Sequence, residues 1–482
     1  MSGVAFSFEM LRLIFLDGFL IKCYNNLCEF IRSLKEKGFM FQRKVNEEGH
    51  LLIGGADTVA LAKEYGTPLY VYDENYIRAM MRVYRDTLEK KYGGNGLVLY
   101  ASKAFSCMGM YAIAKSEGLG ADVVSGGELY TALKAGFPAD KMMMHGNNKL
   151  KSELSLAVEH GVGWIVVDSL SEADTLNMLA REKGRTQKIL LRINPGVEAH
   201  THSYVQTATP DSKFGFSIAD GSAKEVVKAL LEKSKLKLDG FHCHIGSQIF
   251  EKSSFVVAAE KCFAFLSDLK SEVGFSCEVL NLGGGYGIHY TSADPELDFS
   301  DYADFFKALI DTVKSECENR SLARPYLCIE PGRSIVGEAG ITLYTVGSIK
   351  EIKGIKKYLA VDGGMFESPR YCLYGSKYEA VLANRANEAP TEFVSIAGKC
   401  CESGDLIGEN FNLPKANRGD ILAVFSTGAY HYSMASNYNR NLIPPVLLVK
   451  EGKAEYLVKP QTYEDLVRND SLPESLKSSS DK

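Results

Sequence analysis

The chain is best understood from one short stretch, Leu97-Val-Leu-Tyr-Ala-Ser-Lys103-Ala104. Its first four residues are apolar and typical of a strand, and they lead into a single lysine followed by small residues. This pattern places the Lys103 amine where a strand meets its loop, at the rim where (β/α) barrels keep their chemistry. Partial burial there is expected to lower the pKa of Lys103, as a lysine that attacks an aldehyde requires. On this stretch alone, a solvated lysine at a strand end is the alternative.

Eight short apolar runs alternate with helical stretches between residues 73 and 335. The runs lie at 97–100, 120–124, 142–145, 164–167, 189–193, 238–242, 279–282 and 326–329. Helical stretches such as 153–159, 171–183 and 255–273 separate them. We therefore predict an α/β fold, a closed parallel (β/α)8 barrel over residues 73–335. Polar residues that follow the runs, including Lys103, His244 and Glu330, would then converge on one pocket.

The rest of the chain divides into a second domain and two terminal segments. Beyond residue 335 the helical period gives way to strand-like runs at 341–346, 358–361, 393–397, 421–425 and 445–449. They predict a C-terminal β domain over residues 336–468, which the segment 40–72 is expected to join through a strand near Leu51. We interpret residues 1–39 as an N-terminal extension, either an added helix or the result of a start assigned ahead of Met40. Residues 469–482 are expected to form a flexible tail.

Composition and charge exclude several classes of protein. The chain has 482 residues, 45% of them hydrophobic and 24% charged, with a formal net charge of −5, as in ordinary globular proteins. Neither nucleic acid nor a membrane is predicted as a partner. The apolar run 6–21 contains three charged residues and lacks the flanks of a signal peptide, so we interpret it as neither signal nor anchor. Eleven cysteines without paired C-x-x-C spacing indicate reduced thiols and a cytoplasmic location.

Two motifs at predicted strand ends suit anionic groups. Asn281-Leu-Gly-Gly-Gly-Tyr-Gly287 offers consecutive backbone N–H groups that can hold one phosphate, although three glycines after a strand also form ordinary turns. In Glu330-Pro-Gly-Arg333, the arginine can bind a phosphate or a carboxylate, and the glutamate can keep a proton on a ring nitrogen. A surface ion pair is the alternative for this second motif.

The motif His242-Cys-His-Ile-Gly-Ser-Gln248 carries two histidines and a hydroxyl. We expect His242 and His244 to face opposite sides of a strand and therefore not to share an ion, so no metal site is predicted. A histidine at the rim can instead stack on an aromatic cofactor, and Ser247 can donate a hydrogen bond to a phosphate. A histidine buried in the core is the alternative.

Two later motifs fall in predicted turns of the β domain. Cys400-Cys-Glu-Ser-Gly-Asp405 offers a thiol that can donate a proton to a carbanion, and packing is the alternative explanation of the cysteine. Gly428-Ala-Tyr-His-Tyr-Ser-Met-Ala-Ser-Asn-Tyr-Asn439 is rich in hydroxyls and amides, which indicates either a ligand-binding loop or an ordinary turn.

Taken in order, these motifs and Tyr100-Ala-Ser-Lys-Ala104 resemble those of the fold-type III pyridoxal-phosphate decarboxylases, and among them the diaminopimelate decarboxylases. The resemblance runs from about Gly49 to Tyr463. It implies an alanine-racemase-like arrangement, in which a barrel that binds pyridoxal 5'-phosphate is followed by a C-terminal β domain. It also implies a small amino-acid substrate and a homodimer whose active sites are shared between subunits.

The same resemblance assigns roles to individual residues. Lys103 would form the Schiff base with the cofactor, His244 would stack on its ring, and Cys401 would be the acid that reprotonates the carbanion. These three form the catalytic set. The cofactor-binding set is Lys103, His244, Ser247, Gly284, Gly285, Glu330, Gly332, Arg333 and Tyr430. The substrate-binding set is Arg333, Arg370, Tyr374, Glu402 and Tyr430. Cys401 and Glu402 would reach into the barrel of the partner subunit.

The expected substrate depends on Arg370 and Glu402, because a distal amino-acid group needs a cation for its carboxylate and an anion for its ammonium. This favours decarboxylation of meso-2,6-diaminopimelate to L-lysine and CO2, the last step of lysine biosynthesis. A sister decarboxylase acting on carboxynorspermidine, ornithine or arginine is the alternative. A catalytically silent regulator is less favoured, since such proteins usually lose the lysine or the thiol, and Lys103 and Cys401 are both present.

Overall fold

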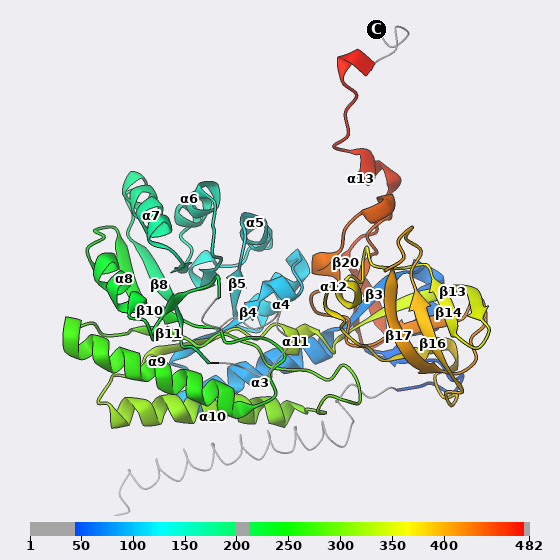
Figure 1. Cartoon of the computed structure of the whole chain (residues 1–482), viewed down its shortest axis with the longest axis horizontal. Helices are drawn as coiled ribbons and strands as arrows, with labels where there is room; N and C mark the ends of the chain where they lie inside the picture. Colours follow the sequence, from blue (N-terminus) through cyan, green and yellow to red (C-terminus); the bar gives the residue numbers. More distant parts are fainter. Residues whose placement is uncertain (1–43, 198–211, 477–482) are drawn as a thin grey trace, which may run out of the picture.

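The computed structural model describes residues 44–197 and 212–476, which form two domains lying side by side (Figure 1). The barrel, largely cyan and green, occupies one side of the view, and the β domain, mostly yellow and orange, occupies the other. The expectations for residues 1–39 and for the end of the predicted tail lie outside the described residues. Within the described ranges, every helix is too short or too polar to span a lipid bilayer.

Eight parallel strands close into the predicted (β/α)8 barrel, and each corresponds to one of the eight predicted runs. They are β4 (Gly96–Ala101), β5 (Gly120–Val123), β6 (Met142–Met144), β7 (Trp164–Val167), β8 (Gln187–Asn194), β10 (Leu236–His242), β11 (Val279–Asn281) and β12 (Tyr326–Ile329). Hydrogen-bonded neighbours follow the order β10-β11-β12-β4-β5-β6-β7-β8, and β10 also pairs with β8, which closes the ring. β9 (Phe216–Ser217) extends the pairing of β8. The predicted fold class is confirmed.

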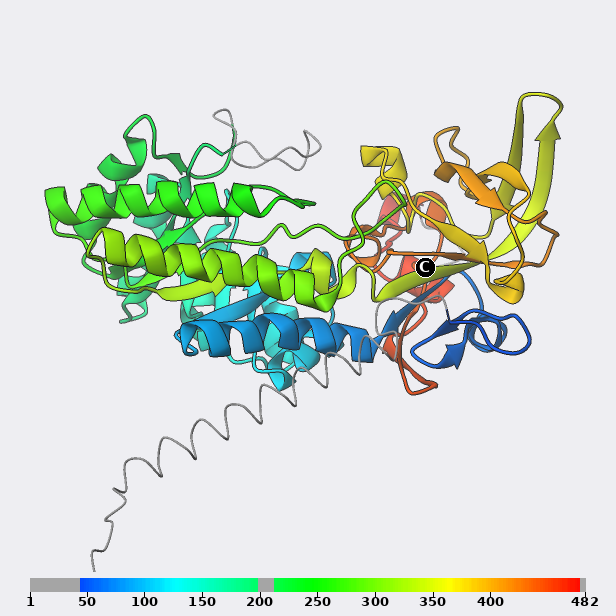
Figure 2. The same ribbon diagram turned by 90° about the horizontal axis from the view of Figure 1, so that it is seen from below.

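Helices surround the barrel, and several of them are capped by residues of the expected kinds. They are α3 (Glu74–Tyr92), α4 (Met108–Ser116), α5 (Gly126–Lys134), α6 (Lys151–His160), α7 (Leu170–Glu182), α8 (Ser222–Leu231), α9 (Lys252–Val273) and α10 (Phe299–Asn319). Ser125 and Ser169 cap α5 and α7 by accepting hydrogen bonds from the backbone N–H groups of Glu128 and Glu172. Gly93 ends α3 with a φ of 67°. Figure 2 shows α3, α9 and α10 side by side, in blue, green and lime.

The barrel interior is filled by apolar side chains near the beginnings and middles of the strands. This cluster consists of Leu97, Leu99, Met143, Val166, Leu190, Val279 and Cys328. Buried polar residues such as Asp122, Asn281 and Glu330 lie at or just beyond the carboxyl ends of the strands, above this apolar layer. The fold therefore separates a packed base from a polar rim.

The β domain is built on a nine-stranded sheet. Its strands are β3 (Leu69–Asp73), β13 (Gly340–Ile352), β14 (Lys356–Val361), β15 (Ala380–Leu382), β16 (Glu392–Ala397), β17 (Leu406–Leu413), β18 (Ile421–Val424), β19 (Val446–Lys450) and β20 (Lys453–Val458). β3 precedes the barrel in sequence and lies between β13 and β19 in the sheet. The five runs predicted beyond residue 335 all correspond to strands. The sequence pattern did not reveal β15, β17 or β20.

The expected strand near Leu51 does not belong to this sheet. β1 (Leu52–Ile53) pairs with β2 (Ala56–Asp57) in a separate two-stranded ladder, which leads into α2 (Thr58–Tyr65). Gly54 and Gly55 turn the chain back immediately, so that neither strand is long enough to extend the large sheet. The side chain of Leu51 still packs into an apolar cluster with residues of β3 and β19. The segment before the barrel therefore enters the large sheet through β3.

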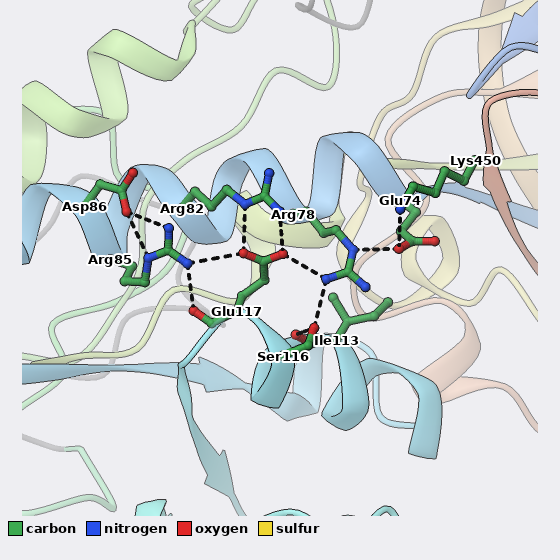
Figure 3. Close-up of polar contacts among 9 residues, drawn as sticks. All are labelled: Glu74, Arg78, Arg82, Arg85, Asp86, Ile113, Ser116, Glu117 and Lys450. Atoms are coloured by element: carbon green, nitrogen blue, oxygen red, sulfur yellow. Dashed lines mark hydrogen bonds and ion pairs between the residues drawn. The ribbon is translucent and has the colours of Figure 1, made fainter. Parts of the chain in front are cut away.

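A cluster of charged residues fastens α3 to its neighbours (Figure 3). Arg78 and Arg82 both donate to the Glu117 carboxylate, just beyond α4, at 2.8 Å. Glu74 pairs with Arg78 and also lies 3.4 Å from Nζ of Lys450, at the end of β19. Burial opposes the charge of Glu117, but the arginines outweigh burial and lower its pKa. The cluster therefore ties the first barrel helix to α4 and to the β domain.

Candidate active site

A cavity of about 440 Å³ opens at the carboxyl ends of the barrel strands. Barrel residues line it from the ends of β4, β6, β8, β10 and β12. The β domain adds a wall from α12 (Arg370–Tyr374) and from the loop that carries Tyr430. The backbone N–H of Tyr430 donates to the carbonyl oxygen of Ala104 at 2.6 Å, which holds this loop against the barrel rim. The position and the volume suit a small organic ligand.

Lys103 lies in the single-turn helix η1 (Ser102–Ala104), directly after β4. Ser102 fixes this turn by donating a hydrogen bond of 2.7 Å to the backbone oxygen of Asp122 on β5. The Lys103 Nζ lies 3.6 Å from Asp122 Oδ2, and its side chain is 38% exposed and lines the cavity. Burial acts to lower the pKa of Lys103, but electrostatic interactions with Asp122, Tyr430 and Glu330 together outweigh burial and raise it. The expectation of a lowered pKa was therefore wrong, because it did not include these neighbouring groups.

Glu330 follows β12, and its buried carboxylate faces three nitrogen atoms. Asn281 Nδ2 donates to Oε1 at 2.7 Å, His145 Nε2 lies 2.8 Å from Oε1, and His242 Nε2 lies 3.3 Å from Oε2. Burial alone would raise the pKa of Glu330, but the two histidines outweigh burial and hold the pKa well below its usual range. Burial also lowers the pKa of His242 to about 3, so its ring is neutral. Glu330 is therefore a buried anion at neutral pH.

The premise of the metal prediction was wrong. Residues two apart in a strand lie on the same side, and both His242 and His244 line the cavity. His145, His242 and Glu330 bring donor atoms within 4.8 Å of one another, a spacing that a metal ion would accept. The short contacts of Glu330 with the two histidines account for all three side chains, so we propose no ion there.

Arg333 forms a cationic corner beside Lys103. It begins α11 (Arg333–Val336) and donates to Ser247 Oγ from Nε at 3.2 Å and from Nη2 at 3.0 Å. Its Nη1 also contacts the hydroxyl of Tyr290. Lys103, Ser247 and Arg333 line a smaller side cavity that adjoins the main one. A guanidinium with a hydroxyl beside it is a suitable binding site for a phosphate.

Three glycines allow the loops around this corner to approach closely. A Cβ atom on Gly284 would lie 2.0 Å from the backbone oxygen of Glu330, and one on Gly285 would lie 2.3 Å from that of Gly246. On Gly332 it would lie 2.8 Å from the Cβ atom of Ala101. A larger residue at any of the three positions would force the strand ends apart. Gly285 and Gly332 line the side cavity, and the N–H of Gly284 donates to His244 Nδ1 at 3.3 Å.

Arg333 and Arg370 are both buried in the cavity wall, and neither forms an ion pair with a carboxylate of the described residues. Both guanidinium groups lie against the ring of Tyr430, with Cζ 4.5 Å and 5.3 Å from its centroid. Within the described ranges, Nε of Arg370 also has no hydrogen-bond partner. Because buried charges in proteins are normally paired, these two cations indicate a pocket that receives two anionic groups.

Cys401 and Glu402 do not line this cavity. Both are exposed in the turn between β16 and β17, where the N–H of Cys401 donates to Asn439 Oδ1 at 2.8 Å. The hydroxyl of Tyr438 lies 3.5 Å from Glu402 Oε2. The other candidate residues do line the two cavities, apart from Gly284 next to them: Lys103, His244, Ser247, Gly285, Glu330, Gly332, Arg333, Arg370, Tyr374 and Tyr430.

Sequence reasoning missed four polar residues of the site: Asp122, His145, Arg192 and Asn281. All four are buried at the rim, and Arg192 lies over the ring of Phe214 at 4.2 Å. A signal was present for Asp122 and Arg192, since each is a charged residue with apolar neighbours on both sides in a barrel strand. A charge at such a position is costly unless a partner or a ligand compensates it.

The groups around the cavity fit pyridoxal phosphate. An amine from Lys103, a buried anion from Glu330 and a cationic corner at Arg333 surround one space, with His244 beside them. These groups match the aldehyde, the ring nitrogen and the phosphate of that cofactor. The absence of a carboxylate partner for Arg333 among the described residues is the observation that favours a phosphate.

Comparisons with known proteins point the same way. Residues 75–337 match the family model described as pyridoxal-dependent decarboxylase, pyridoxal binding domain. The diaminopimelate decarboxylase of Bacillus subtilis is 51% identical over 425 residues, 88% of this chain and 96% of that protein. That of Staphylococcus aureus is 47% identical over 429 residues, 89% of this chain and 99% of that protein. A solved structure of diaminopimelate decarboxylase from M. jannaschii with L-lysine has a TM-score of 0.83 at 36% identity, and covers 90% of this chain and 98% of that one.

Proposed function

The chain belongs to the diaminopimelate decarboxylases, within the pyridoxal-dependent decarboxylase family, and we propose that it converts meso-2,6-diaminopimelate to L-lysine and CO2. It is thus a carboxy-lyase that uses pyridoxal phosphate. The relative from M. jannaschii was solved with L-lysine, the product that this reaction would release. The observation that carries the proposal is the pair of buried cations, Arg333 and Arg370, which both lie against the ring of Tyr430.

Arg370 distinguishes diaminopimelate from substrates without a distal carboxylate. Its side chain is buried in the cavity wall and stacks on Tyr374 at 5.1 Å. A carboxylate can satisfy this guanidinium with two parallel hydrogen bonds. Ornithine and arginine end in cationic groups, which would meet a like charge at this wall. The pocket therefore favours a substrate that carries an anionic group at its far end.

Four residues of the chain's own barrel would hold the cofactor. When bound, pyridoxal phosphate supplies an electron sink for the electron pair that remains as carbon dioxide leaves. Lys103 would hold its aldehyde carbon, and Arg333 with Ser247 would bind its phosphate. Glu330 would keep a proton on the ring nitrogen, since its own carboxylate is held as an anion.

The proton donor would come from a second copy of the chain, in a homodimer with shared active sites. Cys401 and Glu402 are exposed and lie outside their own chain's cavity, where they can complete the cavity of that second copy. There the Cys401 thiol would return a proton to the α-carbon, and Glu402 would bind the distal ammonium group. Arg370 and Tyr374 would act in the chain's own cavity.

Offering four substrates in parallel tests the proposed reaction. The holoenzyme is expected to release CO2 from meso-diaminopimelate, with L-lysine as the amine product, and to leave ornithine, arginine and carboxynorspermidine unchanged. Arg370→Gln is expected to raise KM for diaminopimelate about 10²-fold, because it removes the partner of the distal carboxylate. Activity on one of the other substrates would instead show that the chain is a sister decarboxylase with a different substrate.

Mixing two inactive variants tests the shared site. Cys401→Ala alone is expected to lower kcat about 10²-fold while the cofactor stays bound, because only proton return is affected. An equal mixture of Lys103→Ala and Cys401→Ala, dissociated and reassembled, is expected to recover about a quarter of the wild-type activity, since half of the dimers then hold one complete site. Steady-state CO2 release measures the recovery. A mixture no more active than its components would show that each site lies within one chain.

A further inference from the structure

Asp405 ends the motif that contains Cys401, and the proposed reaction gives it no role. Its side chain is only 3% exposed. Oδ1 accepts a hydrogen bond from the backbone N–H of Met365 at 2.5 Å, and Oδ2 accepts one from that of Cys400 at 2.6 Å. Met365 lies shortly before Arg370 in the sequence, and Cys400 directly precedes Cys401. One carboxylate therefore fastens two segments that are distant in sequence.

The two segments carry different parts of the substrate site. We call residues 363–374 the arginine segment, because it includes Arg370 and Tyr374. We call residues 398–405 the thiol turn, because it includes Cys401 and Glu402. Arg370 and Tyr374 of the arginine segment line the chain's own cavity, whereas Cys401 and Glu402 of the thiol turn are exposed and lie outside it.

Two further hydrogen bonds join the arginine segment to the thiol turn. The N–H of Lys399 donates to the backbone oxygen of Gly363 at 2.9 Å. The thiol of Cys372, on α12, donates to the backbone oxygen of Gly404 at 2.9 Å. A third hydrogen bond joins the two ends of the thiol turn: the N–H of Gly398 donates to the backbone oxygen of Asp405 at 2.9 Å. The two segments are therefore held as one unit, with the Asp405 carboxylate between them.

Two glycines make room for that carboxylate. A Cβ atom on Gly364 would lie 2.7 Å from both carboxylate oxygens of Asp405, and one on Gly398 would lie 2.3 Å from Oδ2. Neither glycine has a positive φ, so the backbone conformation does not require glycine at either position. The close approach of the carboxylate does require it. The surroundings of Asp405 are thus shaped to admit this side chain.

Building on the proposed function with its shared sites, we infer that Asp405 is a positioning residue that couples the two active sites of the dimer. Through Met365 it orients the arginine segment, which binds substrate in the chain's own cavity. Through Cys400 it orients the thiol turn, which completes the cavity of the second copy. A shift of either segment is transmitted to the other through one rigid carboxylate.

Hybrid holoenzyme dimers of full-length chains test this inference. In a dimer of one Lys103→Ala copy and one Cys401→Ala copy, a single cavity retains both Lys103 and Cys401. Asp405→Asn on the Lys103→Ala copy, which donates the thiol, is expected to lower kcat about tenfold or more, and also to raise KM because the same turn carries Glu402. The same substitution on the Cys401→Ala copy, which provides Arg370, is expected to raise KM for diaminopimelate about tenfold or more. Visible cofactor absorbance is expected to stay constant in both hybrids.

Asp420→Asn is the matched control. Asp420 is also buried in the β domain and accepts a backbone hydrogen bond, from Asn417 at 2.7 Å, and its side-chain partners Asn384 and Arg385 lie outside both segments. It is expected to leave kcat and KM unchanged in either copy. If Asp405→Asn does not fold, Gly364→Ala can be used instead, because it displaces the carboxylate without removing it. It is expected to lower kcat on the Lys103→Ala copy and to raise KM on the Cys401→Ala copy.

The possible outcomes separate the inference from its premise. An effect confined to one of the two placements, or present at neither, would overturn the coupling while leaving the shared sites in place. Hybrids without activity even before Asp405 is changed would overturn the shared-site proposal, and the coupling with it. A fall in kcat at one placement together with a rise in KM at the other supports the inference.

Discussion

Replacing Lys103 by Ala is expected to lower kcat at least about 10³-fold and to abolish the visible absorbance of the bound cofactor. Lys103 lines both the main and the side cavity, at the point where they adjoin. Among the described residues it is the only lysine that lines either cavity, so no second amine is in place to substitute for it. Absorbance spectra of the purified variant with added cofactor, together with CO2 release, measure both effects.

Lys103→Arg is the control for the loss of charge. Removing the lysine also removes the cation 3.6 Å from Asp122, which would leave that fully buried carboxylate with weaker compensation. Arginine keeps a cation opposite Asp122 but offers no amine, so it is expected to preserve the melting temperature while staying inactive and colourless. Visible absorbance that persisted in Lys103→Ala would mean that the lysine is only structural.

The barrel could be predicted from the sequence because its strands are buried on both faces. Most of the strands are therefore mainly apolar runs, and helices, several of them with capping side chains, separate the runs. β17 lacks such a signal, since Glu409 and Asn410 in its middle are exposed and Asn410 has a φ of 60°. Whether such a segment becomes a strand depends on a neighbouring strand, here β16, which a local pattern does not reveal.

The sequence predicted which residues lie at the site where they directly follow a strand. It did not predict properties that depend on side chains from other strands. Lys103, Glu330 and Arg333 follow strand ends directly, so the barrel prediction alone brings them to one rim. The sign of the pKa shift of Lys103 depends on Asp122, which becomes a neighbour only when β4 pairs with β5. The charge of Glu330 likewise depends on His145, from β6, across the barrel. Such effects follow from the register and curvature of the barrel rather than from any one motif.

Glu330→Gln is expected to lower kcat on the order of 10²- to 10³-fold while the cofactor remains attached. The carboxylate and the amide have nearly the same size, so the cavity keeps its shape. The amide is neutral and cannot keep a proton on the ring nitrogen, which weakens the electron sink. It would also turn an N–H₂ group toward donors such as Asn281 Nδ2, now 2.7 Å from Oε1, or His242 Nε2. Cofactor absorbance and steady-state CO2 release separate attachment from turnover.

The same substitution at Glu338 provides a control, because the two buried glutamates differ in charge. Burial raises the pKa of Glu338 to about 8, so below that pH its carboxyl is protonated, with the Tyr76 hydroxyl 3.2 Å away. Glu338→Gln therefore exchanges one neutral group for another at pH 7 and is expected to leave kcat unchanged. If Glu330→Gln also left kcat unchanged, the anion at Glu330 would not be the partner of the ring nitrogen. A large loss at residue 330 alone would show that the charge held by Asn281 and the two histidines, and not the shape of the side chain, supports the reaction.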